Sequence, residues 1–441
     1  MIRKISGWGR SSSSLTDLRL FESTESFEKM KSARGFIPRG LGRSYGDSAA
    51  NTGGITLETN TLKMIKIDSA TSIAVLGAGV TILDLERESL KSGCFPFVVP
   101  GTAKVTMGGA IASDIHGKSH HKVGSFSNHV LEMKLMRSDG IVKTIRPDDD
   151  TSDLFWATVG GMGLTGIIVE VTIQLRKVET SYVVVSEARA GNLEELLRVL
   201  KDFNETHLYT VAWVDLSGKS HGRGIVSGAN HAKINEIPFN SMPKKLKSIA
   251  PHQMQIPYKF RINLVKNTTI RVFNFVWFHK PLGKKLQQIQ KYMHPLDGIR
   301  NWNVIYGKKG FVQYQFVVPL DRIDTLQRTL EILRSAKCSS FLTVLKSFGE
   351  PSRGLISFPI QGWTLAIDLP AGKKELTSIL RKLDKIVIEA GGRIYLTKDS
   401  RLDSDLLPLM YPNLNQWKVI KDKFDPTNQW QSDQGRRLNL C

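Results

Sequence analysis

The sequence predicts an α+β protein with two domains. Its 441 residues exceed what one ordinary hydrophobic core holds, and the 41% hydrophobic content is that of a folded globular protein. Up to about residue 178 the pattern is short strands, few helices and three glycine-rich loops, whereas longer helices alternate with strands beyond it. We therefore expect a first domain at 1–178, a second at 179–390 and a segment at 391–441 that returns to the first.

The first domain is predicted as short strands around one main helix. Residues 81–92 carry apolar side chains at helical spacing, and Gly93 then stops the helix. The Ser-Asp-Gly sequence at 138–140 predicts a hairpin between strands 131–136 and 141–145. Further strands are expected at 54–58, 64–68, 72–76 and 167–175, with short helices at 23–33 and 153–157.

The second domain is predicted to alternate strands with longer helices. Residues 216–268 are irregular and basic, with Glu236 as their one acid, and indicate a mobile loop over this domain. Its expected strands are 182–186, 208–215, 271–278, 313–318, 341–347 and 363–369, and its expected helices are 193–203, 322–335 and 374–390. A strand with a polar turn at 392–401 and a helix at 417–424 are expected in the C-terminal segment.

The formal net charge of +20 favours anionic partners, such as phosphorylated substrates, anionic lipid or nucleic acid. A lysine-rich solvated surface explains the same charge, so charge alone does not decide between these alternatives. The three cysteines, Cys94, Cys338 and Cys441, predict neither a disulfide framework nor a metal site and fit a reducing compartment. Without an apolar run for a membrane span or a Sec-type signal, we expect a cytoplasmic protein with peripheral contact to the inner membrane.

Residues 100–121 are the stretch most suited to ligand binding. Gly101, Gly108 and Gly109 let the backbone approach a ligand closely, with N–H groups free to face an anion. Similar glycine-rich loops occur at 39–47 and 160–166. Together these loops predict a bound ligand that contains phosphate.

The common short motifs for other chemistries are missing. No Gly-x-x-x-x-Gly-Lys-Ser/Thr is present for a Walker-type triphosphatase, and no Gly-x-Ser-x-Gly for a serine hydrolase. The loop at 39–47 lacks the third glycine and helix of a Rossmann site. His116, His120 and His121 have neither the spacing nor the carboxylates of a zinc or iron site, so no metal is predicted. A dinucleotide held in extended form by two loops remains.

Five motifs carry a resemblance to a known family. They are Gly-Leu-Gly-Arg-Ser-Tyr-Gly-Asp at 40–47, Asp-Ile-His-Gly-Lys-Ser-His-His at 114–121, Leu-Phe-Trp-Ala-Thr-Val-Gly-Gly at 154–161, Tyr-Gln-Phe-Val-Val-Pro at 314–319 and Lys-Asp-Ser-Arg at 398–401. In their order and spacing they resemble the vanillyl-alcohol-oxidase, or PCMH-type, flavoproteins, and among these the branch that oxidises polyprenyl-phosphoryl riboses. The resemblance implies an FAD-dependent oxidoreductase acting on CH–OH groups, with a PCMH-type FAD-binding domain and an antiparallel-sheet cap domain for the substrate.

The resemblance also implies which residues hold FAD. The pyrophosphate is expected to accept hydrogen bonds from backbone amides of 39–48 and 106–109. Residues 42–45 contain no histidine or cysteine that could tether the flavin through this loop, so the FAD is predicted to be non-covalent. The implied cofactor residues are Arg39, Gly40, Leu41, Gly42, Arg43, Ser44, Tyr45, Gly46, Asp47, Ser48, Gly101, Thr106, Met107, Gly108, Gly109, Ser113, Asp114, Ile115, His116, Ile168 and Tyr395.

The implied substrate is a polyprenyl-phosphoryl-β-D-ribose, whose 2′-hydroxyl is oxidised to the 2′-keto sugar. This is the first half of an epimerisation to the arabinose form for cell-wall polysaccharide, and a short-chain-dehydrogenase-type keto-reductase is the implied partner. Such chemistry needs a group that takes the hydroxyl proton and cations for the phosphate. The implied catalytic residues are Lys398 first, then Tyr45, Lys346, Gln313, Gln315 and Lys118.

Three further positions matter for the substrate pocket. Trp213 is expected to pack against the substrate from the cap. Ala366 stands where the closest branch has a cysteine that traps covalent inhibitors, so resistance to them is expected. Met293 replaces an aromatic residue of the cap, which leaves the sugar and the lipid length open.

Two other functions account for part of the sequence. A related FAD-linked oxidase of a free polyol or aldonolactone would need no lipid, and the strongly basic cap favours a lipid phosphate over it. A nucleic-acid-binding protein would explain the charge but not the glycine loops, and no helix-turn-helix, zinc-finger or aromatic RNA-binding motif is present. We therefore expect no nucleic-acid partner.

Overall fold

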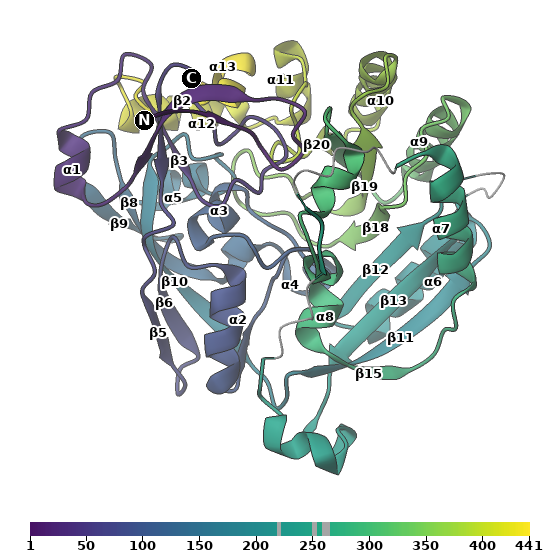
Figure 1. Cartoon of the computed structure of the whole chain (residues 1–441). Helices are drawn as coiled ribbons and strands as arrows, with labels where there is room; N and C mark the ends of the chain where they lie inside the picture. The colour runs from purple at the N-terminus through teal and green to yellow at the C-terminus, as the bar shows by residue number, and fades with distance from the viewer. Residues whose placement is uncertain (218–221, 249–253, 258–264) are drawn as a thin grey trace.

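The computed structural model describes residues 1–217, 222–248, 254–257 and 265–441. The chain forms two halves that lie side by side, each built on β-sheet (Figure 1). The N-terminal and C-terminal parts, purple and yellow, share the left half, and the teal and green middle of the chain forms the right half. The arrangement confirms the α+β class.

Two sheets build the left half. The first has the order β1-β2-β4-β3 and consists of β1 (Ile2–Ile5), β2 (Ser14–Leu20), β4 (Ile55–Glu58) and β3 (Phe36–Arg39). The second is antiparallel in the order β5-β6-β10-β8-β9, from β5 (Ile65–Asp68), β6 (Ile73–Gly77), β10 (Ile167–Lys177), β8 (Val130–Met136) and β9 (Val142–Ile145), with β7 (Cys94–Pro96) also paired to β10. The β8–β9 hairpin confirms the prediction from Asp139-Gly140.

The helices of the left half are short. The main one, α2 (Ile82–Lys91), begins after Thr81, whose side chain accepts from the Asp84 amide while the Asp84 side chain accepts from the Thr81 amide. Its buried Ile82, Leu85 and Leu90 face the second sheet, as the helical spacing predicted. The others are α1 (Thr24–Glu28), α3 (Met107–Ala112), α4 (His120–Val123), the 3₁₀ turn η1 (Phe126–His129) and α5 (Ser152–Thr158).

One antiparallel sheet of eight strands builds the right half. Its order is β15-β11-β13-β12-β18-β19-β17-β20, from β15 (Lys285–Gln288), β11 (Tyr182–Ala190), β13 (Gly224–His231), β12 (Tyr209–Val214), β18 (Thr343–Phe348), β19 (Gly362–Pro370), β17 (Phe311–Val318) and β20 (Arg393–Ile394). The amphipathic helices α6 (Leu193–Thr206), α9 (Ile323–Ser335) and α10 (Leu376–Glu389) bury their apolar stripes on one face of it.

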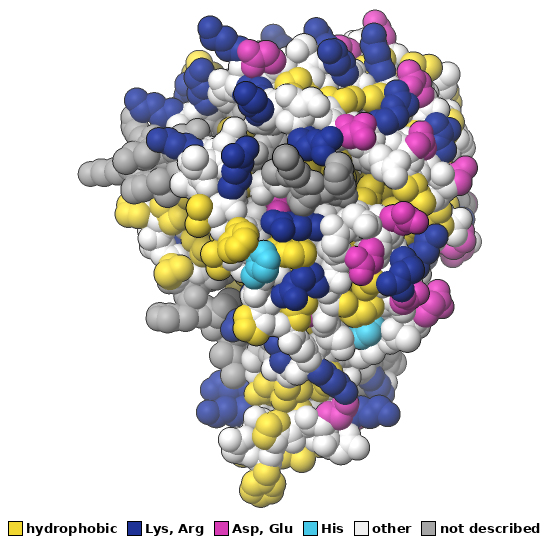
Figure 2. Space-filling model, turned by 90° about the vertical axis from the view of Figure 1, so that its right-hand side faces the viewer, with side chains coloured by type: hydrophobic (Ala, Val, Ile, Leu, Met, Phe, Trp, Pro, Cys, Tyr) yellow, Lys and Arg dark blue, Asp and Glu magenta, His cyan; other side chains and the backbone are white. Residues whose placement is uncertain are grey.

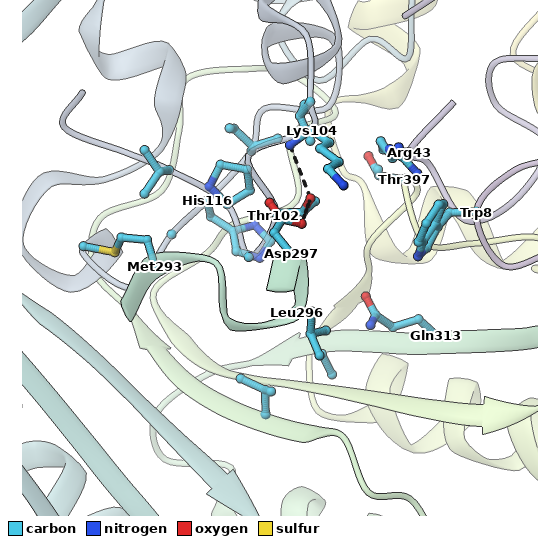
Figure 3. A pocket seen from close by; sticks show the side chains of 18 of the residues that line it. Trp8, Arg43, Thr102, Lys104, His116, Met293, Leu296, Asp297, Gln313 and Thr397 are labelled. Atoms are coloured by element: carbon cyan, nitrogen blue, oxygen red, sulfur yellow. Dashed lines mark hydrogen bonds between the residues drawn. The ribbon is translucent and has the colours of Figure 1, made fainter. Parts of the chain in front are cut away.

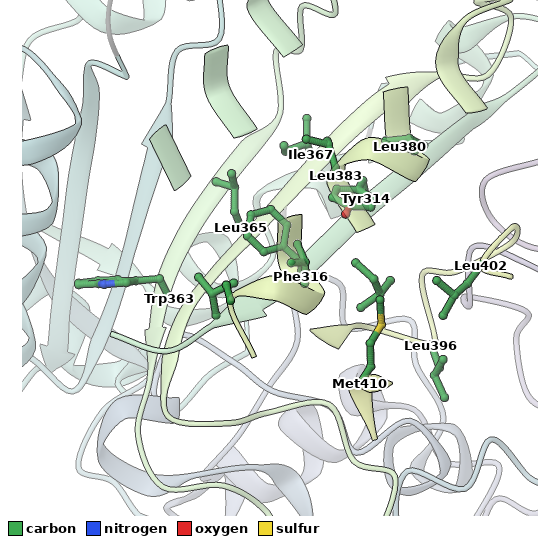
Figure 4. Packing of buried hydrophobic residues seen from close by; sticks show 14 of the residues in the cluster. Tyr314, Phe316, Trp363, Leu365, Ile367, Leu380, Leu383, Leu396, Leu402 and Met410 are labelled. Atoms are coloured by element: carbon green, nitrogen blue, oxygen red, sulfur yellow. The ribbon is translucent and has the colours of Figure 1, made fainter. Parts of the chain in front are cut away.

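Side-chain alternation divides the two faces of this sheet. On β17, Tyr314 and Phe316 enter the core with Leu380 and Leu383 of α10 (Figure 4). Because successive side chains of a strand point to opposite faces, Gln313 and Gln315 lie on the other face, towards the left half. The sheet thus presents polar side chains to the interface between the halves.

The remaining elements connect or cover these sheets. Between β13 and β17 lie η2 (Ile234–Glu236), η3 (Phe239–Lys244), β14 (Met254–Gln255), α7 (Asn267–His279), α8 (Ile289–Met293), η4 (Pro295–Gly298), β16 (Ile299–Arg300) and η5 (Trp302–Tyr306). After β20 come η6 (Ser404–Leu406), α11 (Leu407–Met410), α12 (Leu414–Phe424) and α13 (Asp433–Arg437). None of the helices in the described ranges is both long and apolar enough to cross a membrane.

The C-terminal segment packs on the first sheet. Gln431 donates its amide to the Phe36 carbonyl at 2.8 Å, and Ser14 on β2 donates its hydroxyl to Asp433 at 2.5 Å. Arg437 binds Asp47 at 2.8 Å and Asp399 at 3.0 Å, so it holds the glycine-rich loop at 39–47 beside the segment that carries Lys398.

Two predictions for residues 216–278 are wrong. The expected loop at 216–268 contains β13, an inner strand, and its residues 218–221, 249–253 and 258–264 lie outside the described residues. A Cβ on Gly228 of β13 would lie 2.6 Å from the Phe203 ring of α6. The glycine that makes 224–231 look unlike a strand is therefore the residue that allows α6 to pack on β13. The strand expected at 271–278 is the helix α7. Its many β-branched and aromatic residues favoured a strand, but the residues it buries, Ile270, Asn274 and Phe278, are four positions apart, which is the spacing of a helix.

Candidate active site

A cavity of about 970 Å³ lies between the two halves. The left half contributes glycine-rich loops and the start of α3, and the right half contributes the polar face of the eight-stranded sheet. Figure 3 shows Met293 at one side, Asp297 beside Thr102 in the middle, and Trp8 and Arg43 at the other side. The cavity has room for a dinucleotide and part of a second ligand.

The loop at 39–47 offers backbone donors to this cavity. Gly42 has a φ of +61°, and a Cβ on Gly40 would lie 2.2 Å from the Thr106 hydroxyl, so glycine permits both the turn and the contact with α3. Within the described ranges the amides of Gly40, Leu41 and Gly42 have no acceptor in the protein. Such a run of amides suits an anion, as the sequence predicted for the FAD pyrophosphate.

The start of α3 does not offer the same donors. The amides of Met107 and Gly108 donate to the Val80 and Ala78 carbonyls at 2.8 and 2.9 Å, and the Gly109 amide donates to Thr106 Oγ1 at 3.3 Å. The β-bridge between Thr81 and Thr106 accompanies the first two bonds and ties the start of α3 to the segment between β6 and α2. We therefore correct the expectation that these amides bind the pyrophosphate.

The predicted cofactor residues divide into two groups. Arg39, Gly46, Asp47, Met107 and Asp114 do not line the cavity: Arg39 donates to the Ser6 and Ala49 carbonyls at 2.8 Å, and Asp114 accepts from the Ser127 amide at 3.2 Å. Arg39 and Asp114 hold the glycine-rich loops in place through bonds made outside the cavity. The others line it: Gly40, Leu41, Gly42, Arg43, Ser44, Tyr45, Ser48, Gly101, Thr106, Gly108, Gly109, Ser113, Ile115, His116, Ile168 and Tyr395.

His116 lies at the junction of the halves as a neutral ring. Burial lowers its pKa well below the ordinary value, and the nearby Lys346 lowers it further. Gln315 donates its amide to His116 Nε2 at 2.9 Å, which places the ring proton on Nδ1. This buried Nδ1 has no partner within the described part of the chain, so it can donate to a ligand.

The three lysines predicted for catalysis line the cavity, and each has a lowered pKa. Burial lowers the pKa of Lys398 to about 7, that of Lys118 to about 7 and that of Lys346 to about 8. Lys118 Nζ donates to the carbonyls of Tyr292 and Met293 at 2.8 and 2.9 Å, so it joins the loop at 114–121 (the histidine loop) to α8 of the cap, the right half. Lys398 and Lys346 are the two better placed to act on a ligand.

Asp368 is a residue that the sequence analysis did not identify as part of the site. It lies opposite Gln313 in the β17–β19 register and accepts from Gln313 Nε2 at 2.5 Å and from the Tyr306 hydroxyl at 3.4 Å. Burial raises the pKa of Asp368 to about 7, and Asp368 in turn acts against the lowered pKa of Lys398. Only the cross-strand register reveals this pairing.

Other cavity residues come from both halves. Trp213, Met293 and Ala366 line it, as expected for the substrate side. Thr102 donates its hydroxyl to Asp297 at 2.6 Å, which closes the glycine loop onto η4 (Figure 3). No group of three or more His, Cys, Asp or Glu side chains in the described ranges could hold a metal ion.

This donor set fits FAD. The first loop supplies backbone amides without protein acceptors, and a Cβ on Gly101 would have no atom within 4 Å, so the cofactor can approach the backbone there. A buried imidazole N–H and apolar walls accompany them.

Comparison with known proteins decides the family. The family described as FAD binding domain matches residues 30–146. The decaprenylphosphoryl-beta-D-ribose oxidase of Mycolicibacterium smegmatis is 38% identical over 450 residues, which cover 99% of this chain and 98% of that protein. The chain belongs to the PCMH-type family of FAD-dependent oxidoreductases. The resemblance inferred from the five motifs is thereby confirmed.

Two other relatives show how the similarity extends through this flavoenzyme. An uncharacterised protein of Streptomyces coelicolor is 34% identical over 82% of this chain and 100% of its own length. The (R)-6-hydroxynicotine oxidase of Paenarthrobacter nicotinovorans is 33% identical, but over 40% of this chain and 39% of its own. The enzyme uses FAD as its cofactor and is an oxidoreductase that acts on a hydroxyl group.

Proposed function

We propose that this flavoenzyme oxidises the 2′-hydroxyl of a polyprenyl-phosphoryl-β-D-ribose to the 2′-keto sugar. The observation that carries the proposal is the similarity to decaprenylphosphoryl-beta-D-ribose oxidase over 99% of the chain, which includes the substrate side of the cavity. We assign FAD binding to 1–178, substrate binding to 179–390 and closure of the site to 391–441. The FAD is non-covalent in this proposal, because residues 42–45 offer no histidine or cysteine.

FAD, when bound, supplies a hydride acceptor. The protein must then take the proton of the sugar hydroxyl. With a pKa of about 7, Lys398 is neutral in a large fraction of molecules near neutral pH and can accept that proton. Asp368 steadies the resulting ammonium, while its bond from Gln313 keeps the amide of that side chain in one orientation.

Other residues of the cavity bind and orient the substrate. Lys346, with a pKa of about 8, is mostly protonated at pH 7 and supplies a cation for a phosphate or sugar oxygen. Gln315 holds His116 in the tautomer whose Nδ1 donates into the cavity. Val185, Val211 and Val344 form an apolar wall on the sheet, which excludes water and suits a prenyl chain.

The proposal places the reaction in a sequence. A 2′-keto sugar is the natural substrate of a keto-reductase, and reduction on the opposite face gives the arabinose form. A short-chain-dehydrogenase-type reductase is therefore the proposed partner, and supply of arabinose to cell-wall polysaccharide is the proposed role.

The competing function is oxidation of a free polyol or aldonolactone, which the FAD-binding half alone would also support. To separate the two, we would add each substrate anaerobically to the purified protein and follow the loss of the flavin's visible absorbance. Bleaching by polyprenyl-phosphoribose and not by polyols supports the proposal; bleaching by polyols alone would replace it. Release of the yellow colour on acid precipitation tests the non-covalent FAD.

A further inference from the structure

Helix α7 (Asn267–His279) buries a polar side chain and exposes large apolar ones, which is the reverse of an ordinary surface helix. Its buried stripe consists of Ile270, Asn274 and Phe278. Asn274 Nδ2 donates to Asp215 Oδ1 at 2.7 Å and to the Ser340 carbonyl at 3.2 Å, so a polar side chain anchors the helix inwards. This bond fixes which face of α7 points away from the protein.

The outward face is apolar. Val272, Phe275 and Val276 are 66%, 59% and 64% exposed, and at 100° per residue they lie opposite the buried stripe. A surface helix normally turns charged or polar residues outwards. Three contiguous large apolar side chains instead mark a surface that contacts an apolar partner.

The surroundings of α7 are cationic. No Asp or Glu occurs between Glu236 and Asp297 in the sequence. Lys280 and Lys285 pair with Glu187 of β11 at 2.8 Å each, and Lys266, Arg271 and Lys284 are exposed beside the helix. Figure 2 shows this face, on which hydrophobic side chains gather among Lys and Arg. The combination favours an anionic partner with an apolar interior.

A second strongly exposed apolar side chain belongs to η3. Phe239 of η3 is 91% exposed, and Lys244 and Lys245 follow it. The segment forms the protrusion at the bottom of Figure 1, and its hydrophobic tip is visible at the bottom of Figure 2. An exposed phenylalanine on a segment that also carries lysines suits contact with a lipid headgroup region.

The helix also borders the active-site cavity. Phe273 and Trp277 of α7 line the cavity, next to Phe341 of the loop before β18. The face formed by Val272, Phe275 and Val276 is thus one side of a helix whose other side reaches the substrate space.

We propose that α7 docks this enzyme on an anionic phospholipid bilayer, with Val272, Phe275 and Val276 among the acyl chains and the cavity mouth at the membrane surface. The choice of a bilayer over a protein rests on the cationic rim and on the proposed function, since a polyprenyl phosphate resides in a membrane. Docking lets the substrate's sugar enter the cavity while its lipid stays in the bilayer.

The test measures binding of the FAD-loaded, full-length protein to vesicles without substrate. Wild type is mixed with sedimentable vesicles of equal parts phosphatidylglycerol and phosphatidylcholine, or of phosphatidylcholine alone. We expect binding to the anionic vesicles that weakens with salt. The partition coefficient of the Val272→Ser/Phe275→Ser/Val276→Ser variant onto anionic vesicles is expected to be lower by about tenfold or more, because each apolar side chain buried in the bilayer contributes to partition.

A matched control is available on the opposite part of the chain. Leu409 of α11 and Val419 of α12 are 64% and 69% exposed, and Leu409→Ser/Val419→Ser should bind vesicles like wild type. Absence of wild-type binding, or equal binding by both variants, would overturn the proposal. Loss of a dimer in the α7 variant, with no vesicle binding by wild type, would assign the face to a second copy instead.

The outcome is separable from that of the proposed function. Val272, Phe275 and Val276 do not line the cavity, so flavin bleaching by a detergent-dispersed polyprenyl-phosphoribose should be unchanged in the α7 variant. Bleaching without vesicle binding contradicts the docking alone. Vesicle binding without bleaching contradicts the substrate and leaves the docking standing.

Discussion

The ammonium nitrogen of Lys398 lies 3.8 Å from the centroid of the Tyr45 ring. The contact joins the C-terminal segment to the first glycine-rich loop, and the Tyr45 amide donates to the Thr397 carbonyl at 3.0 Å beside it. An aromatic face attracts an ammonium, whereas burial opposes its charge. Burial lowers the pKa of Lys398 to about 7, with Asp368 acting against the shift and Lys346 adding to it, and this value suits a group that exchanges a proton near neutral pH.

Replacing Lys398 tests its role as the proton acceptor. Lys398→Met should lower the rate of substrate-dependent flavin reduction by about 100-fold or more, the range of general-base catalysis. Stopped-flow absorbance measures this rate, and FAD content shows that the site is intact. Lys423→Met, at a lysine on α12 that does not line the cavity, serves as the control. Flavin reduction at the wild-type rate in Lys398→Met would contradict the role.

The same assignment predicts a pH profile. Lys398 accepts a proton only when neutral, so kcat/KM should rise as pH increases through about 7. It should fall again above about 8, as Lys346 loses the charge assigned to substrate binding. Asp368 raises the pKa of Lys398, and Asp368→Asn should therefore shift the midpoint to lower pH. Steady-state rates from pH 5 to 9 measure both curves. A midpoint unmoved in Asp368→Asn would show that this coupling is absent.

A methyl group on Gly40 should disturb cofactor binding. Its Cβ would lie 2.2 Å from Thr106 Oγ1, so Gly40→Ala must move the loop away from α3 and displace the cavity amides. We expect the FAD dissociation constant to rise about tenfold or more, an energetic change of about 1.4 kcal/mol. Flavin fluorescence on dilution measures it. Gly283→Ala is the control, since a Cβ there meets nothing within 4 Å; equal affinities in both variants would refute the argument.

Arg437 should stabilise the fold and the first loop together. It binds both Asp47 and Asp399, and removing the cation leaves two carboxylates close together with little solvent. Arg437→Met is expected to lower the free energy of unfolding by about 2–3 kcal/mol, below the range for a fully buried pair because the arginine is partly exposed. Urea unfolding measures the loss. Arg381→Met, which removes the exposed pair with Asp403, should cost about 0.5 kcal/mol or less.

A thiol at position 366 should be reactive from the cavity. Ala366 lines it on β19, whereas Cys94 and Cys338 are buried. Ala366→Cys should gain one site for a thiol-directed reagent, protected by bound substrate, while wild type resists inhibitors that require this thiol. Intact-protein mass spectrometry counts the adducts. An unmodified Ala366→Cys protein would show that the position is closed to reagents.

The sequence predicted most of what is local. The helical spacing over 81–92 predicted α2, Asp139-Gly140 predicted a hairpin, and the glycine loops with their motifs predicted FAD. Gln313 and Gln315, which the resemblance implied for the site, both line the cavity. These features depend on neighbours in the chain.

The errors concern long-range packing. The β-formers of 271–278 fold as a helix because Ile270, Asn274 and Phe278 find a site against the sheet, and β13 gains its strand conformation from partners on both sides. Asp368 joins the site through the strand register, and the amides of Met107 and Gly108 donate to carbonyls of the segment that follows β6. No local pattern encodes these partners.

The bonds across the cavity bear on how ligands exchange. Thr102 with Asp297, and Lys118 with the carbonyls of Tyr292 and Met293, fasten the glycine and histidine loops to the cap. A hinge motion that separated the halves would break these three hydrogen bonds and leave the Lys118 ammonium without its two carbonyl acceptors. Turnover is therefore expected to proceed in a closed molecule: the sugar threads in from the mouth beside α7, and FAD stays bound from one catalytic cycle to the next.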